Sequence, residues 1–209
     1  GLLLIGGAAR LLADLRRRVT TNRELRAIGT ADHDMLVADL PAPMAVAVPG
    51  TKRRRGHLLV TAGMLRLLDA REREVLFAHE RAHLAHRHHR FTSVVAAAAA
   101  VNPLLIPARD TVAYLVERWA DEDAAADVGD RALTARAVTR AALATTSAGP
   151  ASGLGIGGGM VVHRVRALSL PAPAPRYRRL IGLVLLGALM LAVAGAATEA
   201  FVDLAQAWL

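Results

Sequence analysis

The sequence contains no cysteine, and only 3% of its 209 residues are aromatic. The absence of cysteine excludes disulfide scaffolds, thiolate zinc sites and thiol nucleophiles, so any metal site must use histidine and carboxylate ligands. Lysine is almost absent as well, since Lys52 is the single lysine among 26 basic residues. The basic residues outnumber 18 acidic ones and give a net charge of +8. This excess of arginine favours an anionic partner, either nucleic acid or a lipid surface.

Hydrophobic residues make up 54% of the chain, which excludes intrinsic disorder. One run, residues 180–198 (LIGLVLLGALMLAVAGAAT), has 19 residues without a charge. A helix needs ~20 such residues to cross a bilayer. Residues 176–179 (RYRR) precede the run directly, as an interfacial anchor does. We therefore expect a transmembrane helix over 180–198, followed by a short tail at 199–209.

The distribution of charge predicts the orientation of this helix. Every lysine and arginine lies between Arg10 and Arg179. The positive-inside rule then places residues 10–179 in the cytoplasm and the tail outside, so we expect an integral protein of the cell membrane. Residues 1–9 are uncharged but too short to span a bilayer. They are expected to be either the end of a truncated transmembrane helix or a buried N-terminal segment.

Residues 91–108 (FTSVVAAAAAVNPLLIPA) form another uncharged stretch. Asn102, Pro103 and Pro107 interrupt it, and alanine contributes little to membrane insertion. Two structures remain open for this stretch: a re-entrant or interfacial helical hairpin, and a buried core helix.

The rest of the chain is predicted to be mainly α-helical with a small β-hairpin. Residues 10–40 are expected to be a basic juxtamembrane segment, 41–144 the main domain, and 145–175 a loop and linker rich in glycine, serine and proline. Within these regions we expect helices over 11–28, 62–68, 70–90, 110–126 and 131–144, and strands over 44–48 and 57–61. The hairpin tip, Lys52–Arg55, is strongly basic, and a solvated turn or lipid contact is favoured there over nucleic acid.

Five of the eight histidines lie between His79 and His89. The run His79-Glu80-Arg81-Ala82-His83 places two imidazoles at i and i+4 of a predicted helix, where both can bind one metal ion. Glu80 lies about 100° further round the helix and can reach a water on the metal without ligating it. Zn²⁺ lowers the pKa of such a water toward ~7, and the carboxylate can pass its proton to a leaving amine. Because H-E-x-x-H is a short motif, a solvated histidine-rich helix is the alternative interpretation.

Two histidines supply half of a tetrahedral zinc site, so a third protein ligand is required. The best candidates are Glu117 and Asp121, which share a helix face at i and i+4. One can ligate zinc while the other accepts a hydrogen bond from a ligand imidazole. Nearby acidic residues are interpreted as surface charge: Glu122, Asp123, Asp127 and Asp130. Three further histidines are left out of the site, and their replacement by alanine should not abolish zinc binding: His86, His88 and His89.

These motifs resemble the gluzincin zinc metallopeptidases of the M48 and M56 groups, the latter including membrane peptidases similar to the β-lactam receptors. The likeness spans roughly residues 41–144 and includes AVAVPG (45–50), LLVT (58–61) and MLRLL (64–68) before the H-E-x-x-H helix. The short interval between the two motifs is more like M56. The resemblance implies a zincin-like domain with one Zn²⁺ and assigns these roles: ligands His79, His83 and Glu117, general base Glu80, and Asp121 orienting a ligand histidine. Related enzymes stabilise the oxyanion with a downstream side chain, for which the candidates in this chain are Tyr114, His163 and Arg166.

The leading function is therefore a membrane-anchored zinc endopeptidase that acts on a protein or peptide. An edge of strand 44–48 or 57–61 can pair with an extended substrate. The expected partners are this substrate and the lipid bilayer, and nucleic acid is not expected. The alternative is a non-catalytic membrane regulator that binds anionic lipid or nucleic acid through arginine; it explains the charge but not the ligand spacing. A peptidase fold that binds zinc without cleaving is a third possibility, against which the intact Glu80 argues.

Overall fold

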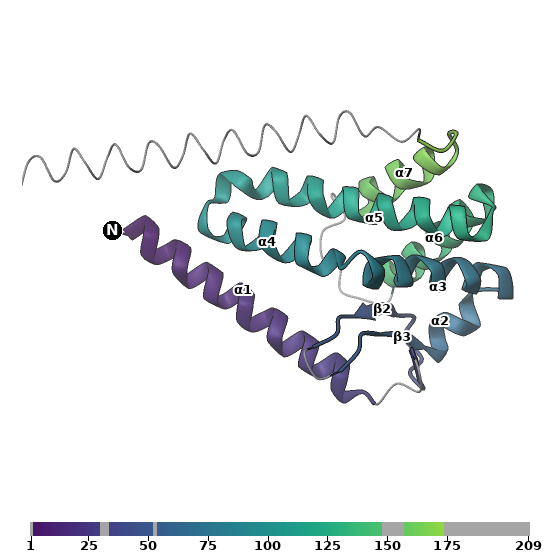
Figure 1. The fold of residues 1–209 in the computed structure, drawn as a ribbon, viewed down its shortest axis with the longest axis horizontal. Helices are drawn as coiled ribbons and strands as arrows, with labels where there is room; N and C mark the ends of the chain where they lie inside the picture. The colour runs from purple at the N-terminus through teal and green to yellow at the C-terminus, as the bar shows by residue number, and fades with distance from the viewer. Residues whose placement is uncertain (1, 30–33, 52–53, 148–156, 174–209) are drawn as a thin grey trace, which may run out of the picture. The chain divides into compact units, whose positions relative to one another are not determined.

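The structure is a computed structural model that describes residues 2–29, 34–51, 54–147 and 157–173. As expected from the sequence, the chain is mainly helical with one small sheet. The elements in order are α1 (Leu2–Ala27), β1 (Met35–Ala38), β2 (Ala45–Val48), β3 (His57–Thr61), α2 (Ala62–Leu67), α3 (Ala70–Ala85), α4 (His88–Val101), the 3-10 turn η1 (Pro103–Leu105), α5 (Ile106–Val128), α6 (Arg131–Ser147) and α7 (Gly157–Leu168) (Figure 1).

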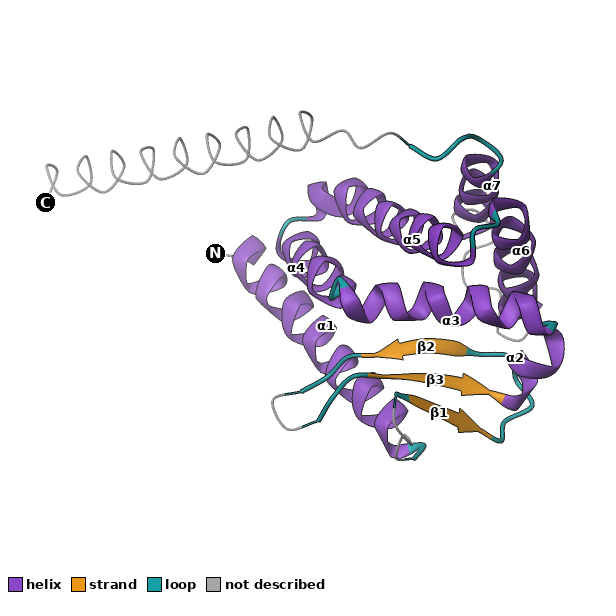
Figure 2. Ribbon diagram, turned by 45° about the vertical axis from the view of Figure 1, so that its right-hand side comes forward, coloured by secondary structure: helices purple, strands orange, loops and turns teal. Residues whose placement is uncertain are grey.

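The sheet has the strand order β1-β3-β2, with β3 fully buried in the middle. β1 pairs with β3 in parallel and β2 pairs with it antiparallel. β1 falls inside residues 10–40, which were expected to be a helical segment, and it shows that the last part of this segment is not helical. Four residues are too few for their hydrophobic pattern to identify a strand, and the partner that stabilises it is distant in sequence. β2 is an edge strand and is the strand nearest to α3 in Figure 2.

Two local caps fix the corner that leads from the sheet into α3. The Thr61 side chain accepts a hydrogen bond from the Met64 N–H and caps α2. Asp69 caps α3 in a reciprocal capping box with Glu72. From this corner α3 runs across the sheet and packs on α5 and α6 through small side chains. Ala78 and Ala124 lie there in one buried cluster with Val75, Leu133 and Ala137.

α3 ends earlier than predicted. The helix was expected to reach about residue 90, but it ends at Ala85, and Arg87 adopts a left-handed conformation (φ 53°) before α4 begins. Glycine or asparagine ordinarily marks such a position, and an arginine gives no signal of it. The break turns the histidine-rich segment back over the end of α3.

The uncharged stretch 91–108 forms a helical hairpin. α4 and α5 are its arms, joined at Asn102 and η1, and the Asn102 side chain accepts from the Leu104 N–H. Ala96 and Ala99 of α4 are buried, whereas every residue from Val101 to Arg109 is exposed. The stretch is therefore neither a single core helix nor wholly buried.

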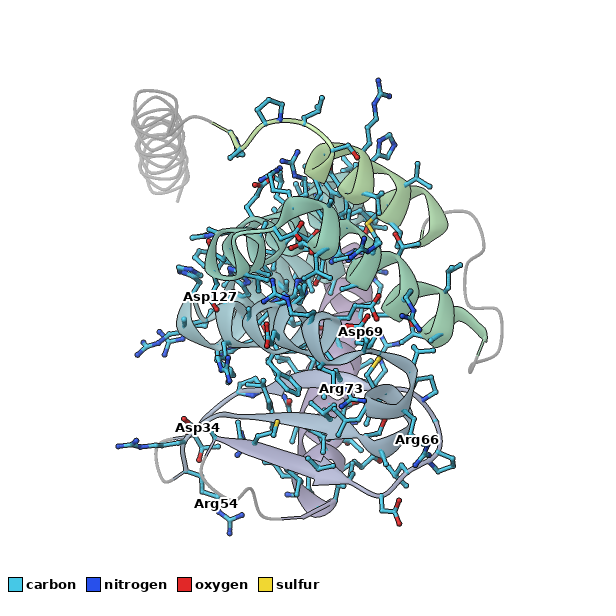
Figure 3. All side chains as sticks on the ribbon, turned by 90° about the vertical axis from the view of Figure 1, so that its right-hand side faces the viewer. Asp34, Arg54, Arg66, Asp69, Arg73 and Asp127 are labelled. Carbon is cyan, nitrogen blue, oxygen red and sulfur yellow. The ribbon has the colours of Figure 1, made fainter. Side chains whose placement is uncertain are left out.

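The two remaining predictions concern the ends of the domain. Residues 145–175 were expected to be loop and linker, but α7 occupies part of them and α6 extends to Ser147. The predicted transmembrane run 180–198 lies outside the described residues. Within the described part of the chain, none of the helices combines the length and the apolar character that crossing a bilayer requires. Of the basic hairpin tip, Lys52 and Arg53 are not described, and Arg54 projects away from the helices (Figure 3).

Candidate metal centre

The two histidines of the H-E-x-x-H run lie one turn apart on α3 and point at the same place. His79 Nε2 and His83 Nε2 are 3.1 Å apart. Their spacing follows from the helix, because residues four apart are neighbours on one face. α3 is held rigid here by its capping box and by its packing on α5. The imidazoles are thus presented by a fixed element rather than by a loop.

Glu117 of α5 completes this group from the opposite side. Its Oε2 lies 3.4 Å from His79 Nε2, and its Oε1 lies 3.5 Å from His83 Nε2. A tetrahedral Zn²⁺ with ordinary bond lengths separates its ligand atoms by about 3.3 Å. The three distances, 3.1, 3.4 and 3.5 Å, are each close to this separation, with one oxygen of Glu117 facing each histidine. The three side chains fit one metal ion, with the fourth position left for water or substrate.

The outer nitrogen of each imidazole also has a neighbour. His79 Nδ1 lies 3.1 Å from Oδ1 of the buried Asp121, without full hydrogen-bond geometry. His83 Nδ1 lies 3.0 Å from Nδ1 of His88, which begins α4 and is only 1% exposed. Such partners fix the tautomer and the ring orientation of metal-ligating histidines. The sequence analysis proposed the first of these contacts and missed the second.

Arg164 of α7 is the other residue that the sequence analysis missed. Its guanidinium holds Asp121 through two hydrogen bonds of 2.7 Å, and its Nη1 lies 3.1 Å from Glu117 Oε2. It thereby ties both carboxylates of α5 to α7. The apolar spacing of Val161, Val165 and Leu168 is the sequence signal that would have indicated this helix.

The charges of the group are strongly coupled. Burial would lower the pKa of His79, but hydrogen bonds to Asp121 and Glu117 raise it to about 10. Burial, with His79 and His88 nearby, lowers the pKa of His83 to about 4, although Glu117 opposes this shift. Burial would raise the pKa of Glu117, but its hydrogen bond to His79 and the charges of His79 and Arg164 lower it to about 2. Without metal, the group therefore holds one proton at neutral pH, on His79.

Glu80 lies beside this group, where two cavities meet. Burial raises its pKa, and a backbone hydrogen bond at Ala47 of β2 partly opposes the shift. One cavity, of about 350 Å³, runs toward α6 and α7 and has mostly apolar walls. The other, of about 390 Å³, follows β2 toward His88 and Thr92 of α4. Both cavities are lined by Ala45, His79, Glu80 and Glu117, so together they give access to the group from two sides.

The three candidates for oxyanion stabilisation lie elsewhere. His163 and Arg166 are exposed on α7, on faces of that helix that differ from the face of Arg164. The Tyr114 ring is half-buried and faces His163, with 6.4 Å between ring centroids. None of the three lines either of the two cavities, whereas Arg164 lines the first.

The remaining acidic residues of α5 have other partners. Asp123 Oδ2 lies 2.6 Å from His86 Nε2, and Glu122 pairs with Arg118 and Arg131. Asp130 accepts from the Leu133 N–H near the start of α6. These contacts agree with leaving the acidic residues out of the metal site.

Comparison with known proteins gives one result that bears on this arrangement. The family model described as peptidase family M48 matches residues 11–113 of the chain. No curated protein and no solved structure gives a significant match. The matched segment contains the sheet, α3 with its H-E-x-x-H run, and α4, and it ends shortly before Glu117. It supports a metallopeptidase of the M48 group, whose members are metal-dependent and typically use zinc, and it confirms the resemblance found in the sequence.

Proposed function

On the premise that this chain is a zinc metallopeptidase of the M48 group, we propose that it is a membrane-anchored endopeptidase that hydrolyses bonds in a protein or peptide substrate. The observation that carries the proposal is the convergence of His79, His83 and Glu117 on one point beside Glu80. The nearest nitrogen and oxygen atoms of the three lie 3.1 to 3.5 Å apart, and in this proposal the neighbouring carboxylate of Glu80 does not belong to the ligand set. In this arrangement His79, His83 and Glu117 would bind the metal, and Glu80 would transfer the proton.

Zinc, when bound, polarises the substrate carbonyl and lowers the pKa of water toward ~7. Glu80 accepts the proton of the attacking water and delivers it to the leaving amine. Burial raises the pKa of the Glu80 carboxyl, which brings it nearer to the working pH of a general base. Asp121 and His88 hold the imidazoles in position, and Arg164 holds the two carboxylates of α5.

The substrate binds, in this proposal, along the free edge of β2. β3 is the middle strand and both its edges are occupied, so of the two strands named from the sequence only β2 can accept a further strand. Ala45 and Ala47 lie on the rim of the second cavity, next to Glu80. An extended peptide paired with β2 would cross the metal group and place one side chain in the apolar cavity. The walls of this cavity include Val75, Leu76 and Val138, so we expect the substrate to have an apolar residue next to the cleaved bond.

The membrane part of the proposal rests on the sequence. The 19 uncharged residues 180–198 suit a membrane-spanning helix, and the arginines all precede it, which places the metal group on the cytoplasmic side. A reporter fused after Leu209 is expected outside, and one placed in the 148–156 segment in the cytoplasm. Both reporters on the same side would contradict the span.

Zinc content and proteolysis of casein, measured on wild type and Glu80→Gln, test the enzyme function. Glutamine keeps the size of the side chain but cannot accept the proton, so zinc should stay while cleavage falls by ~10²–10⁴. Glu74→Gln is the matched control, because Glu74 is exposed on the same helix and pairs only with Arg71 among the described contacts. Equal cleavage by Glu80→Gln and wild type would refute the mechanism, and zinc binding without cleavage in wild type would favour a non-cleaving fold.

A further inference from the structure

The turn between α4 and α5 is an exposed apolar surface. All nine residues from Val101 to Arg109 are exposed, and only Asn102 and Arg109 among them are polar. Leu104, at the tip, is 85% exposed, and Leu105 and Ile106 beside it are also exposed. Contiguous exposed apolar surface on a protein marks an interaction site.

A second apolar segment lies at the same end of this unit. The backbones of Gly7 and Val101 are so close that a Cβ at Gly7 would lie 3.1 Å from the Val101 carbonyl oxygen. Arg10 Nε donates to the Ala100 carbonyl at 2.9 Å, and Arg18, two turns further along α1, contacts Ser93, which is earlier in α4. The two helices therefore run antiparallel. The first turn of α1 therefore lies beyond Gly7, level with the tip of the hairpin (Figures 1 and 2). Residues 2–9 (LLLIGGAA) carry no charge.

Two uncharged segments that are about a hundred residues apart in sequence thus meet at one end, and we call the exposed segment there, residues 101–108, the apolar end. The nearest charged residues are basic. Arg10 lies one turn behind Gly7 and is exposed, and Arg109 follows the tip and pairs with Asp110. An apolar tip bordered by arginine is complementary to a bilayer with anionic headgroups, where arginine meets phosphate and apolar side chains enter the acyl boundary.

We propose that the apolar end inserts shallowly into an anionic lipid bilayer. The apolar residues form a protruding helical turn, not a groove that would receive a peptide. The chain carries a net charge of +8, and outside the described residues it contains the bilayer-length run 180–198. The proposal concerns the opposite end of α5 from the metal ligand Glu117, about 16 Å along the helix, and does not depend on zinc chemistry.

The absence of cysteine makes a direct test simple, because single cysteines can be introduced and labelled with an environment-sensitive fluorophore. Leu104→Cys reports the apolar end, and Val162→Cys on α7, at a side chain that is 65% exposed, is the matched control. Both are made in the full chain, so both samples contain the run 180–198. In vesicles of equal parts phosphatidylcholine and phosphatidylglycerol, the label at 104 should shift to the blue and be quenched by nitroxide lipids, and the label at 162 should not. Zinc content is measured on the same samples, which separates a failure of the metal site from a failure of this proposal.

Two results would overturn the proposal. The first is that nitroxide lipids quench the labels at 104 and 162 equally, or quench neither label. The other is a blue shift at 104 that rises with protein concentration in the absence of vesicles, which would make the apolar end an interface between copies. The double substitution Arg10→Gln and Arg109→Gln adds a second readout: quenching at 104 should fall several-fold in anionic vesicles and little in pure phosphatidylcholine.

Discussion

His88 Nδ1 lies 3.0 Å from Nδ1 of His83, whose other nitrogen faces the metal group. One imidazole thus positions another, while its own Nε2 is buried and has no hydrogen-bond partner among the residues that the structure describes. Because His83 must present Nε2 to a metal, its Nδ1 carries the proton and His88 accepts it. His88 belongs to a different helix, so the contact also ties the start of α4 to α3.

The first prediction follows from this contact. His88→Ala should weaken zinc affinity ~10–100-fold, because His83 loses the partner that fixes its tautomer and ring orientation. The sequence predicted only that His88→Ala does not abolish zinc binding, and the contact with His83 now adds a measurable loss of affinity. Competition with a chelator measures the affinity, with His89→Ala as the control. His88→Asn, which keeps an acceptor near the same place, should restore most of the affinity; an unchanged affinity in His88→Ala would show that the contact is not needed.

The carboxylates of α5 should differ in their effect on zinc. Glu117→Ala removes a ligand oxygen and should lose both zinc and activity. Asp121→Asn keeps the shape but not the charge beside His79, and should weaken affinity or activity about 10–100-fold. Metal analysis after dialysis against a weak chelator ranks the two variants. Retention of zinc by Glu117→Ala would mean that another carboxylate is the third ligand.

Arg164 should matter for stability even without metal. Asp121 is 2% exposed, and Arg164→Gln removes the guanidinium that holds its carboxylate and leaves the imidazole of His79 as its remaining cationic neighbour among the described residues. Breaking a buried ion pair from one side costs ~3–5 kcal/mol of unfolding free energy. Denaturant unfolding of the zinc-free protein measures this cost. Arg166→Gln, at an exposed position on the same helix, should change the unfolding free energy by less than ~0.5 kcal/mol.

Zinc binding should release about one proton. Hydrogen bonds to Asp121 and Glu117 raise the pKa of metal-free His79 to about 10, so this imidazole is charged at neutral pH and must lose its proton to bind zinc. The pKa of His83 is lowered to about 4, so this imidazole is already neutral. Between these two values the apparent affinity should rise about tenfold per pH unit. Calorimetry in buffers of different ionisation enthalpy counts the proton, and a count of zero would contradict a protonated His79 in the metal-free protein.

Asp69 supplies a prediction about the fold alone. Asp69→Ala removes the cap of α3 and should lower the unfolding free energy by ~1 kcal/mol. Asp127→Ala is the matched control, because Asp127 is exposed near the C-terminal end of α5 and caps no helix (Figure 3). This substitution should change the unfolding free energy by less than ~0.5 kcal/mol. Equal effects of the two substitutions would show that the cap contributes nothing measurable.

The sequence predicted those parts of the site that depend on local spacing. Residues four apart on a helix share a face whatever surrounds them, which is why the pairs His79/His83 and Glu117/Asp121 were found. His88 could not be found in this way, because its approach to His83 depends on the left-handed turn at Arg87. Arg164 reaches the site from a helix more than forty residues further along the chain. β1 was missed for a similar reason, since its partner β3 lies beyond β2 in the sequence.

The length of α5 sets how far the metal group lies from the apolar end. Glu117 follows Ile106 by eleven residues on one continuous helix, a rise of about 16 Å. An extended peptide covers about 3.3 Å per residue, so about five residues would span that gap. With the apolar end in the bilayer, a substrate that emerges from the same membrane would be cut about five residues from its surface. The helix would then act as a ruler, and the cleavage site would be selected by distance from the membrane as well as by side chain.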